Sequence, residues 1–567
     1  MGNSSVCHVF FIFNSTHCHG TEFLSAEISS NPRFRYSGGL NFSVSRARVS
    51  GKLLKSGIIV SVMTFISRIL GLVRDVVVAK LMGDGAAADV FFFANKIPNF
   101  LRRLFAEGAF AQAFIPVLTE VHHQDDKAEL RTFIARVSGT LGAIVFVVAI
   151  LGVLASPVLT AIFGTGWFIA WWQGEEAGGK FELASVMLKI TFPYLAFITL
   201  TGLAGAILNT LNRFAVAAFT PVLLNICIIL CAWFVAPALS QPAFALAWGV
   251  FIGGIVQLLF QLPFLYRAGL LVKPKWGWHD PGVVKVRTLM IPALFGVSVG
   301  QINLLFDTLI ASFLVTGSIS WLYYSDRLLE FPLGLFGIAI ATVILPTLSR
   351  NHVANDPKAF SGNMDWGVRM VSLLGIPAAV GLAFMAEPIM TVIFQRGAFT
   401  AETARMASYS LVAYAFGLVS FMWVKVLAPG FFSRQDTKTP VKFGIWCMIA
   451  NMVFNLIFAI PYGYIGLAIA TSLSATLNAG LLYTTLHKNG VYRASRETLF
   501  FLIKVVIAST LMAGVIVYFD QGDAFYALDL TAQIYHVTLT IGSAVAVFLF
   551  VLLVSGVRKR HFRAFGG

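Results

Sequence analysis

The sequence predicts an all-α polytopic membrane protein. Of its 567 residues, 57% are hydrophobic and 12% are charged, whereas a soluble protein would carry about twice that charged fraction. Nearly uncharged runs of about 18 residues or more recur along the chain, and each is long enough to cross the hydrocarbon core as a helix. The shorter alternating segments that would build a membrane β-barrel are not found in the sequence.

Fourteen apolar windows, separated by polar breaks, are predicted to be transmembrane helices. Their approximate extents are 56–82, 88–118, 131–162, 183–208, 216–238, 243–268, 284–315, 318–348, 365–391, 402–428, 440–460, 463–486, 497–519 and 531–556. Similar motifs recur six spans apart: "AFAQAFIPVLTE" with "GIAIATVILPTLSR", and "ILNTLNRFAVAAFTP" with "LAPGFFSRQDTKTP". This repeat predicts two pseudo-symmetric six-helix lobes followed by two extra C-terminal helices, and repeated halves are typical of transporters.

Four regions follow from this pattern. Residues 1–52 are rich in Ser, Asn and Gly and are predicted to be a disordered extension. We expect an N-lobe of helices 1–6 at 53–270 and a C-lobe of helices 7–12 at 271–490. Residues 491–567 hold helices 13–14 and a tail.

The positive charge of the chain follows the predicted loops. The net charge is +15, and Lys and Arg gather in alternate loops, while the other loops hold little beyond Lys180 and Arg396. This is the positive-inside pattern, and it predicts that both termini are cytoplasmic. The charge therefore reflects membrane topology rather than nucleic-acid binding. The five cysteines form no CxxC or Cys/His cluster, so no zinc site is predicted.

Three predicted spans carry charges that a lipid-facing helix would not tolerate. In the first, Arg68, Gly71 and Asp75 share one helical face and Arg74 lies beside it. The second carries a charged stripe interrupted by Pro98, and the eighth carries a group of charges just before Pro332. The stripe consists of Asp89, Lys96, Arg103 and Glu107, flanked by Arg102, and the group in the eighth span consists of Asp326, Arg327 and Glu330.

Each such charge costs about 2.5–3.5 kcal/mol at the bilayer centre, so these side chains are expected to face the protein interior. They could form structural ion pairs, such as Arg74 with Asp75 or Arg327 with Asp326. They could instead line a water-filled cavity. Arginines outnumber the nearest acids, and the planar guanidinium donates two parallel hydrogen bonds to phosphate. The surplus therefore favours an anionic cargo. The predicted substrate-binding residues are Arg68, Arg74, Arg102 and Arg327, and the predicted charge partners are Asp75, Asp89, Lys96, Arg103, Glu107, Asp326 and Glu330.

An enzyme active site is not predicted. The chain has no GxxxxGK[ST] loop for a nucleotide, no HExxH and no GxSxG. Any driving force for transport is therefore expected to be ionic or electrical.

Four stretches resemble the MurJ (MviN) family of bacterial lipid II flippases. They are "MTFISRILGLVRDVVVAKLMG", "ADVFFFANKIPNFLRRLFAEGAFAQAFIPVL", "SWLYYSDRLLEFPLGLFGIAIATVILPTLS" and "KVLAPGFFSRQDTKTPVK", within a resemblance that covers about Leu53 to the C-terminus. The resemblance implies the multidrug/oligosaccharidyl-lipid/polysaccharide exporter (MOP) fold, with the last two helices forming a groove for a lipid tail. It also implies functional importance for the matched residues Arg68, Arg74, Asp75, Asp89, Lys96, Arg102, Asp326 and Arg327.

The activity implied by the resemblance is flipping of lipid II, the undecaprenyl-pyrophosphate-linked disaccharide-pentapeptide, for peptidoglycan synthesis. Lipid II would move from the cytoplasmic to the periplasmic leaflet of the bacterial inner membrane by alternating access. Membrane lipids and cell-wall synthesis proteins are the other expected partners, and no cofactor is expected.

Coupling to membrane potential or to Na⁺ is a further implication of the resemblance. The residues that match a sodium site between spans seven, eleven and twelve are Asp307, Asn451, Asn455 and Thr471. Their oxygens suit a hard cation, but ordinary interhelical hydrogen bonding explains them equally well.

Three other functions stay open at this point. A flippase for another polyprenyl-pyrophosphate-linked saccharide would need the same anion site. A multidrug antiporter of this fold would favour an acidic, aromatic cavity. A scaffold that transports nothing would tolerate single changes of the cavity arginines.

Overall fold

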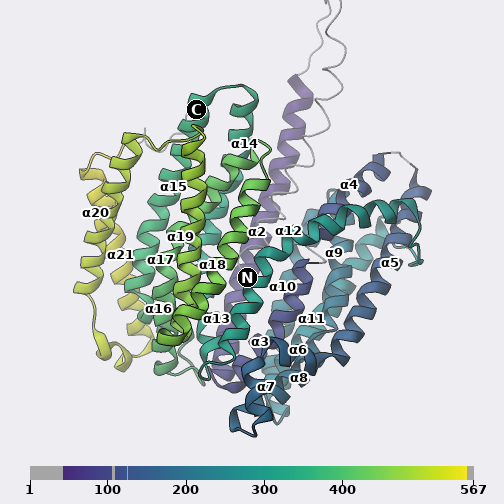
Figure 1. Ribbon diagram of the computed structural model, residues 1–567, viewed down its shortest axis with the longest axis horizontal. Helices are drawn as coiled ribbons and strands as arrows, with labels where there is room; N and C mark the ends of the chain where they lie inside the picture. The colour runs from purple at the N-terminus through teal and green to yellow at the C-terminus, as the bar shows by residue number, and fades with distance from the viewer. Residues whose placement is uncertain (1–42, 105–108, 124–125, 559–567) are drawn as a thin grey trace, which may run out of the picture.

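The computed structural model describes residues 43–104, 109–123 and 126–558, and this part of the chain is helical without strands (Figure 1). Eleven helical segments within it are long and apolar enough to cross a membrane. The predicted all-α membrane class is therefore confirmed.

A first bundle is formed by the helices up to α11 and occupies the right of Figure 1, beside the long helix α2 (Ser43–Met82). α2 packs on α10. The other helices of this bundle are α3 (Ala86–Arg102), α4 (Phe110–His123), α5 (Lys127–Leu154), α6 (Ser156–Phe163), α7 (Thr165–Trp172), η2 (Glu176–Gly178), α8 (Gly179–Thr191), α9 (Tyr194–Thr210), α10 (Phe214–Leu230), η3 (Cys231–Val235), η4 (Ala236–Ala238) and α11 (Ala243–Arg267).

A second bundle occupies the left of Figure 1. α12 (Pro281–Ala311) connects the two, because it packs on α4 and α5 of the first bundle and on α18 of the second. The remaining helices are α13 (Ser318–Pro332), η5 (Leu333–Gly337), α14 (Ile338–Val353), α15 (Pro357–Phe384), α16 (Ala386–Phe394), α17 (Ala401–Phe432), α18 (Lys438–Tyr462) and α19 (Tyr464–Lys488), with α20 (Arg496–Tyr518), η6 (Gly522–Ala527) and α21 (Leu530–Val554) at the outer edge.

Several helices differ in extent from the predicted spans. α2 already begins at Ser43, inside the segment predicted to be disordered. The second predicted span covers α3 and α4, which lie on either side of residues 105–108, outside the described part of the chain. The fourth is divided between α8 and α9 at Pro193, whose ring removes a backbone donor and interrupts the helical hydrogen bonds. The eighth contains the π-helical turn η5, which follows Pro332.

The loop between α11 and α12 lies across α5. The backbone N–H of Lys275 donates to the carbonyl of Ala135 at 2.8 Å, and the N–H of Gly277 donates to the Thr140 hydroxyl at 2.9 Å. Gly139 permits this approach, because a Cβ there would lie 2.2 Å from the Lys275 carbonyl oxygen. The connection between the bundles is therefore fixed to the first bundle.

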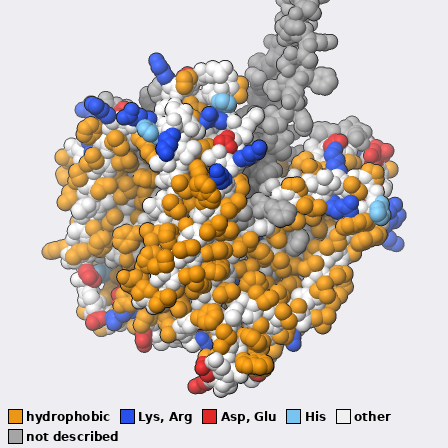
Figure 2. Space-filling view, in the orientation of Figure 1, with side chains coloured by type: hydrophobic (Ala, Val, Ile, Leu, Met, Phe, Trp, Pro, Cys, Tyr) orange, Lys and Arg blue, Asp and Glu red, His pale blue; other side chains and the backbone are white. Residues whose placement is uncertain are grey.

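Hydrophobic side chains cover the middle of the molecule, and most of the Lys and Arg visible in Figure 2 lie toward its upper end. Large apolar residues such as Leu154 and Val554 are each 72% exposed. Apolar surface of this extent would promote aggregation in water. It is the surface expected of a protein that faces lipid.

Candidate functional site

A cavity of about 370 Å³ lies between the bundles, with walls from α2, α3, α9, α10, α11, α13 and η5. Its volume is typical of a ligand site. Among the described residues, its lining includes one acid, Glu330, and five arginines, so positive charge dominates the wall. The arginines are Arg68, Arg74, Arg102, Arg103 and Arg327. The structure thus brings all four arginines predicted to bind substrate, and Arg103 with them, into one cavity.

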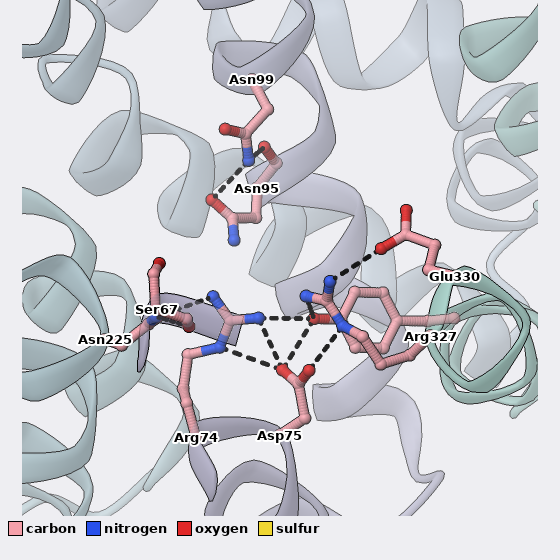
Figure 3. A network of polar contacts seen from close by, with 9 residues as sticks. Ser67, Arg74, Asp75, Asn95, Asn99, Asn225, Arg327 and Glu330 are labelled. Atoms are coloured by element: carbon pink, nitrogen blue, oxygen red, sulfur yellow. Dashed lines mark hydrogen bonds and ion pairs between the residues drawn. The ribbon is translucent and has the colours of Figure 1, made fainter. Parts of the chain in front are cut away.

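Arg74 is held from two sides (Figure 3). Its Nε and Nη2 donate to Asp75 Oδ1 at 3.0 and 2.6 Å. Its Nη1 donates to Asn225 Oδ1 on α10 at 3.1 Å. Asn225 is anchored in turn by a 3.2 Å hydrogen bond from its Nδ2 to the Ser67 carbonyl on α2. The guanidinium therefore has a defined orientation at the cavity wall.

Arg327 reaches Asp75 from the second bundle. Arg327 Nε lies 2.6 Å from Asp75 Oδ2, and Arg327 Nη1 lies 3.1 Å from Glu330 Oε2. The side chain of Asp75 is 1% exposed, while those of Arg74 and Arg327 are 13% and 19% exposed. The carboxylate lies behind the two guanidinium groups and joins α2 to α13. The pairing of Arg74 with Asp75 suggested by the sequence is present, whereas Arg327 forms its ion pairs with Asp75 and Glu330.

The other three arginines have separate supports. The guanidinium of Arg68 packs so closely on η5 that a Cβ at Gly334 would lie 2.1 Å from its Nη1. Arg102 Nε donates to Asn99 Oδ1 at 3.1 Å. Arg103 Nη1 donates to Gln301 Oε1 on α12 at 3.1 Å.

Asp89 lies outside the lining of this cavity, which differs from its predicted placement. Its carboxylate accepts hydrogen bonds at the start of α13, from Gly317 N at 2.7 Å and from Ser320 N and Oγ at 2.9 and 2.7 Å. Lys180 Nζ lies 3.8 Å from the same carboxylate. Asp89 therefore caps a helix of the other bundle, where a negative charge is favoured. Lys180, predicted to lie in a loop, is buried beside it.

Three other predicted charge partners have different positions. Lys96 lies on α3 but donates to the Thr308 hydroxyl of α12 at 3.2 Å, outside the cavity lining. Asp326 is likewise outside the lining, close enough to Lys96 for their charges to interact. Glu107 falls outside the described residues.

The four residues of the predicted sodium site lie together. Asn455 Nδ2 donates to Asp307 Oδ1 at 2.5 Å and to Asn451 Oδ1 at 3.0 Å, and Asn451 Nδ2 donates to the Thr471 hydroxyl at 3.4 Å. They join α12, α18 and α19. Asn455 Oδ1 is buried and accepts no hydrogen bond from the described residues. An oxygen of this kind fits a hard cation. Among the described residues there is no group of three or more His, Cys, Asp or Glu side chains that could hold a metal ion.

Sequence reasoning missed three polar residues around the cavity: Asn95, Asn225 and Tyr323. Asn95 precedes Asn99 by one helical turn, and Asn225 lies in an apolar span. Because a polar side chain inside a span is costly, both amides could have been recognised from the sequence as residues that face the protein interior. Tyr323 carried no such signal, because tyrosine is common in membrane helices.

Two helix bundles with a charged cavity between them are typical of membrane transporters, and comparisons with solved structures show which transporter fold this is. A solved inward-facing transporter of the MATE family, in the MOP superfamily, matches with a TM-score of 0.64 over 76% of this chain and 98% of its own, at 12% identity, and so shares the fold. A solved structure described as "Lipid II flippase MurJ, inward closed conformation" matches with a TM-score of 0.73 over 88% of this chain and 98% of its own, at 28% identity.

The sequence comparisons name the family. The family model described as "Lipid II flippase MurJ" matches residues 78–535. A relative from Vibrio cholerae, described as a probable lipid II flippase MurJ, is 62% identical over 91% of this chain and 98% of its own. The Lipid II flippase MurJ of Burkholderia cenocepacia is 40% identical over 82% and 89%. The chain belongs to the MurJ family of lipid II flippases, which are transporters and not enzymes.

Proposed function

We propose that this protein moves lipid II from the cytoplasmic to the periplasmic leaflet of the bacterial inner membrane. The observation that carries the proposal is the gathering of five arginines from both bundles around one cavity. The pyrophosphate of lipid II is the anionic part of its lipid linkage, and guanidinium groups bind such oxygens in pairs with a charge that is permanent. Arg68, Arg74 and Arg327 bind the pyrophosphate, and Arg102 lies along the α3 wall.

Transport proceeds by alternating access of the cavity to the two sides of the membrane. Several contacts between the bundles lie beyond the arginines, at the junction of α2 and α3. Ala398 N donates to the Lys80 carbonyl at 3.0 Å, and Trp321 Nε1 donates to Asp84 Oδ2 at 2.8 Å. These contacts, with the cap at Asp89, close the outer side. They must break when the cavity opens outward. Cargo binding neutralises the repulsion among the arginines and permits the inner side to close.

The membrane topology that we propose has fourteen spans and both termini in the cytoplasm. The eleven spans recognised by hydropathy are completed by α2, the α3–α4 pair and α12. The end of the molecule that carries α14 is cytoplasmic, which agrees with the concentration of Lys and Arg there in Figure 2. The opposite end carries α7 with the exposed Trp171 and Trp172, suited to the outer interface.

The proposed lobes are residues 53–270 and 271–490, related by pseudo-symmetry. α20 packs on α15, and α21 packs on α20 and α16, at the edge of the second bundle. We propose that this pair forms a groove for the undecaprenyl tail, which stays in the bilayer while the headgroup crosses.

The driving force is membrane potential or a Na⁺ gradient. One charge crossing 100 mV gains about 2.3 kcal/mol, which is enough to bias the equilibrium between two states more than tenfold. The buried oxygen of Asn455, beside Asp307, supports Na⁺ as the second option. Flipping in vesicles with an imposed K⁺ diffusion potential separates the two. A Na⁺ requirement at constant potential indicates the ion, and full activity in Na⁺-free buffer indicates the potential alone.

Arg74→Ala and Arg327→Ala test the function in a strain depleted of its own flippase. Each variant should fail to support growth at normal protein level, because each removes a guanidinium from the anion site. Arg267→Ala is the matched control, since Arg267 is exposed at the end of α11 and outside the cavity lining. Normal growth with either cavity variant would contradict the proposal.

A further inference from the structure

We propose that Tyr323 is the positioning residue of the anion site, holding Arg74 and Arg327 together without cancelling their charge. This inference rests on the proposed function and adds a residue to it. Tyr323 lies on α13, whereas Arg74 and Asp75 lie on α2, so its contacts join the two bundles.

The Tyr323 hydroxyl is shared by three charged groups. It accepts hydrogen bonds from Arg74 Nη2 and from Arg327 Nη2, each at 3.0 Å. It donates to Asp75 Oδ1 at 2.9 Å. A phenol both donates and accepts hydrogen bonds, so this one hydroxyl can serve the two guanidinium groups and the carboxylate together. Because both nitrogens bind one oxygen, they are no more than twice that hydrogen-bond length apart.

The ring of Tyr323 is fixed in place. Phe92 of α3 stacks on it with ring centroids 3.9 Å apart and an interplanar angle of 20°. Tyr324 meets it edge-on at 5.6 Å, and the guanidinium of Arg327 lies over it at 5.4 Å. The ring therefore has little freedom to rotate, and its hydroxyl is a fixed point between the bundles.

A neutral acceptor is suited to this role. Two guanidinium groups this close repel each other, and the repulsion is larger in a poorly solvated site than in water. Asp75 offsets the repulsion but also removes positive charge that the cargo needs. The neutral phenol offsets the repulsion with its dipole and removes no positive charge from the site. Arg74 and Arg327 thus keep a fixed spacing at which one phosphate or pyrophosphate group contacts both.

Tyr323→Phe tests this role, because it removes the hydroxyl and keeps the ring that stacks on Phe92. Tyr324→Phe is the matched control: it is the same change one residue later, in a buried ring whose hydroxyl is 3.5 Å from the Gly83 carbonyl and outside the arginine network. The full-length protein is reconstituted in vesicles with lipid II, and binding, flipping and the thermal unfolding midpoint are measured for each variant.

Tyr323→Phe should bind lipid II about tenfold or more weakly, since two charge-assisted hydrogen bonds are lost, and its unfolding midpoint should match that of Tyr324→Phe. Tyr324→Phe should bind like the wild type. In an Arg327→Ala background, the added effect of Tyr323→Phe on binding should shrink to about twofold or less, because residues that act as one unit are not additive.

The outcomes separate the two proposals. If the wild type neither binds nor flips lipid II, the proposed function is overturned and this inference with it. If the wild type does both but Tyr323→Phe behaves like Tyr324→Phe, only the inference is overturned. It is also overturned if weaker binding comes with a lower unfolding midpoint, or if the effect is fully additive with Arg327→Ala, because either result indicates a merely structural tyrosine.

Discussion

At the residue scale, two buried carboxylates show what a charge inside a membrane span can do. Asp75 and Asp89 are 1% and 2% exposed, and from the sequence alone the same argument applies to both. In the structure, Asp75 balances two arginines at the cavity, while Asp89 caps a helix of the other bundle. The sequence could show that each is costly in lipid. It could not show what each contacts, because the partner of Asp89 is more than 200 residues away.

Asp89→Ala should lower stability without removing a cavity charge. The change leaves the buried N–H groups of Gly317 and Ser320 without an acceptor, at a cost of about 1–3 kcal/mol for each. Asp89→Asn should cost less, because one oxygen remains as an acceptor. Thermal unfolding in detergent measures both, and an unchanged midpoint for Asp89→Ala would rule out the capping role.

At the scale of elements, the helices were predictable and their contacts were not. Apolar windows located the spans because the bilayer requires them. The division of the fourth span at Pro193 depends on local geometry. The position of the α11–α12 loop on α5 depends on a hydrogen bond between residues more than 100 positions apart. Hydropathy carries no information about such contacts.

Gly139→Ala should loosen the connection between the bundles. Its Cβ would overlap the Lys275 backbone, which cannot move aside as a flexible side chain can, and overpacking of this kind costs about 1–3 kcal/mol. Gly142→Ala is the control on the same helix, since its Cβ would meet Leu200 at an ordinary 3.6 Å. Limited proteolysis at the α11–α12 loop should accelerate for Gly139→Ala only. Equal rates for the two variants would mean that the loop is not held by this contact.

At the scale of the whole molecule, two helices that line the cavity are not among the eleven segments that length and hydropathy identify as spans. These helices are α2 and α3, which supply three of the five cavity arginines, Arg68, Arg74 and Arg102. The sequence indicated that these arginines face the interior, because a charge that cannot face lipid must do so, and in the structure they line one cavity; their binding of substrate stays a prediction. Asp89 and Lys96, predicted as charge partners in the cavity, lie outside its lining, and the sequence offered no prediction for Tyr323. The positions of all three depend on how the two bundles meet.

Cysteine labelling tests the proposed topology. In a chain whose five native cysteines are replaced by serine, Glu175→Cys and Lys358→Cys place single thiols at exposed positions near opposite ends of the molecule. A membrane-impermeant maleimide added to intact cells should label residue 175 and not residue 358, which should react only after lysis. The reverse pattern would invert the topology.

The central claim is that this protein carries lipid II across the membrane, and the most direct measurement is the outer-leaflet accessibility of lipid II in cells. Depleting the protein should leave lipid II protected from an external probe while its total amount rises. Re-expression of the wild type should restore accessibility, and Arg74→Ala should not. Lipid II that stays accessible after depletion would contradict the account.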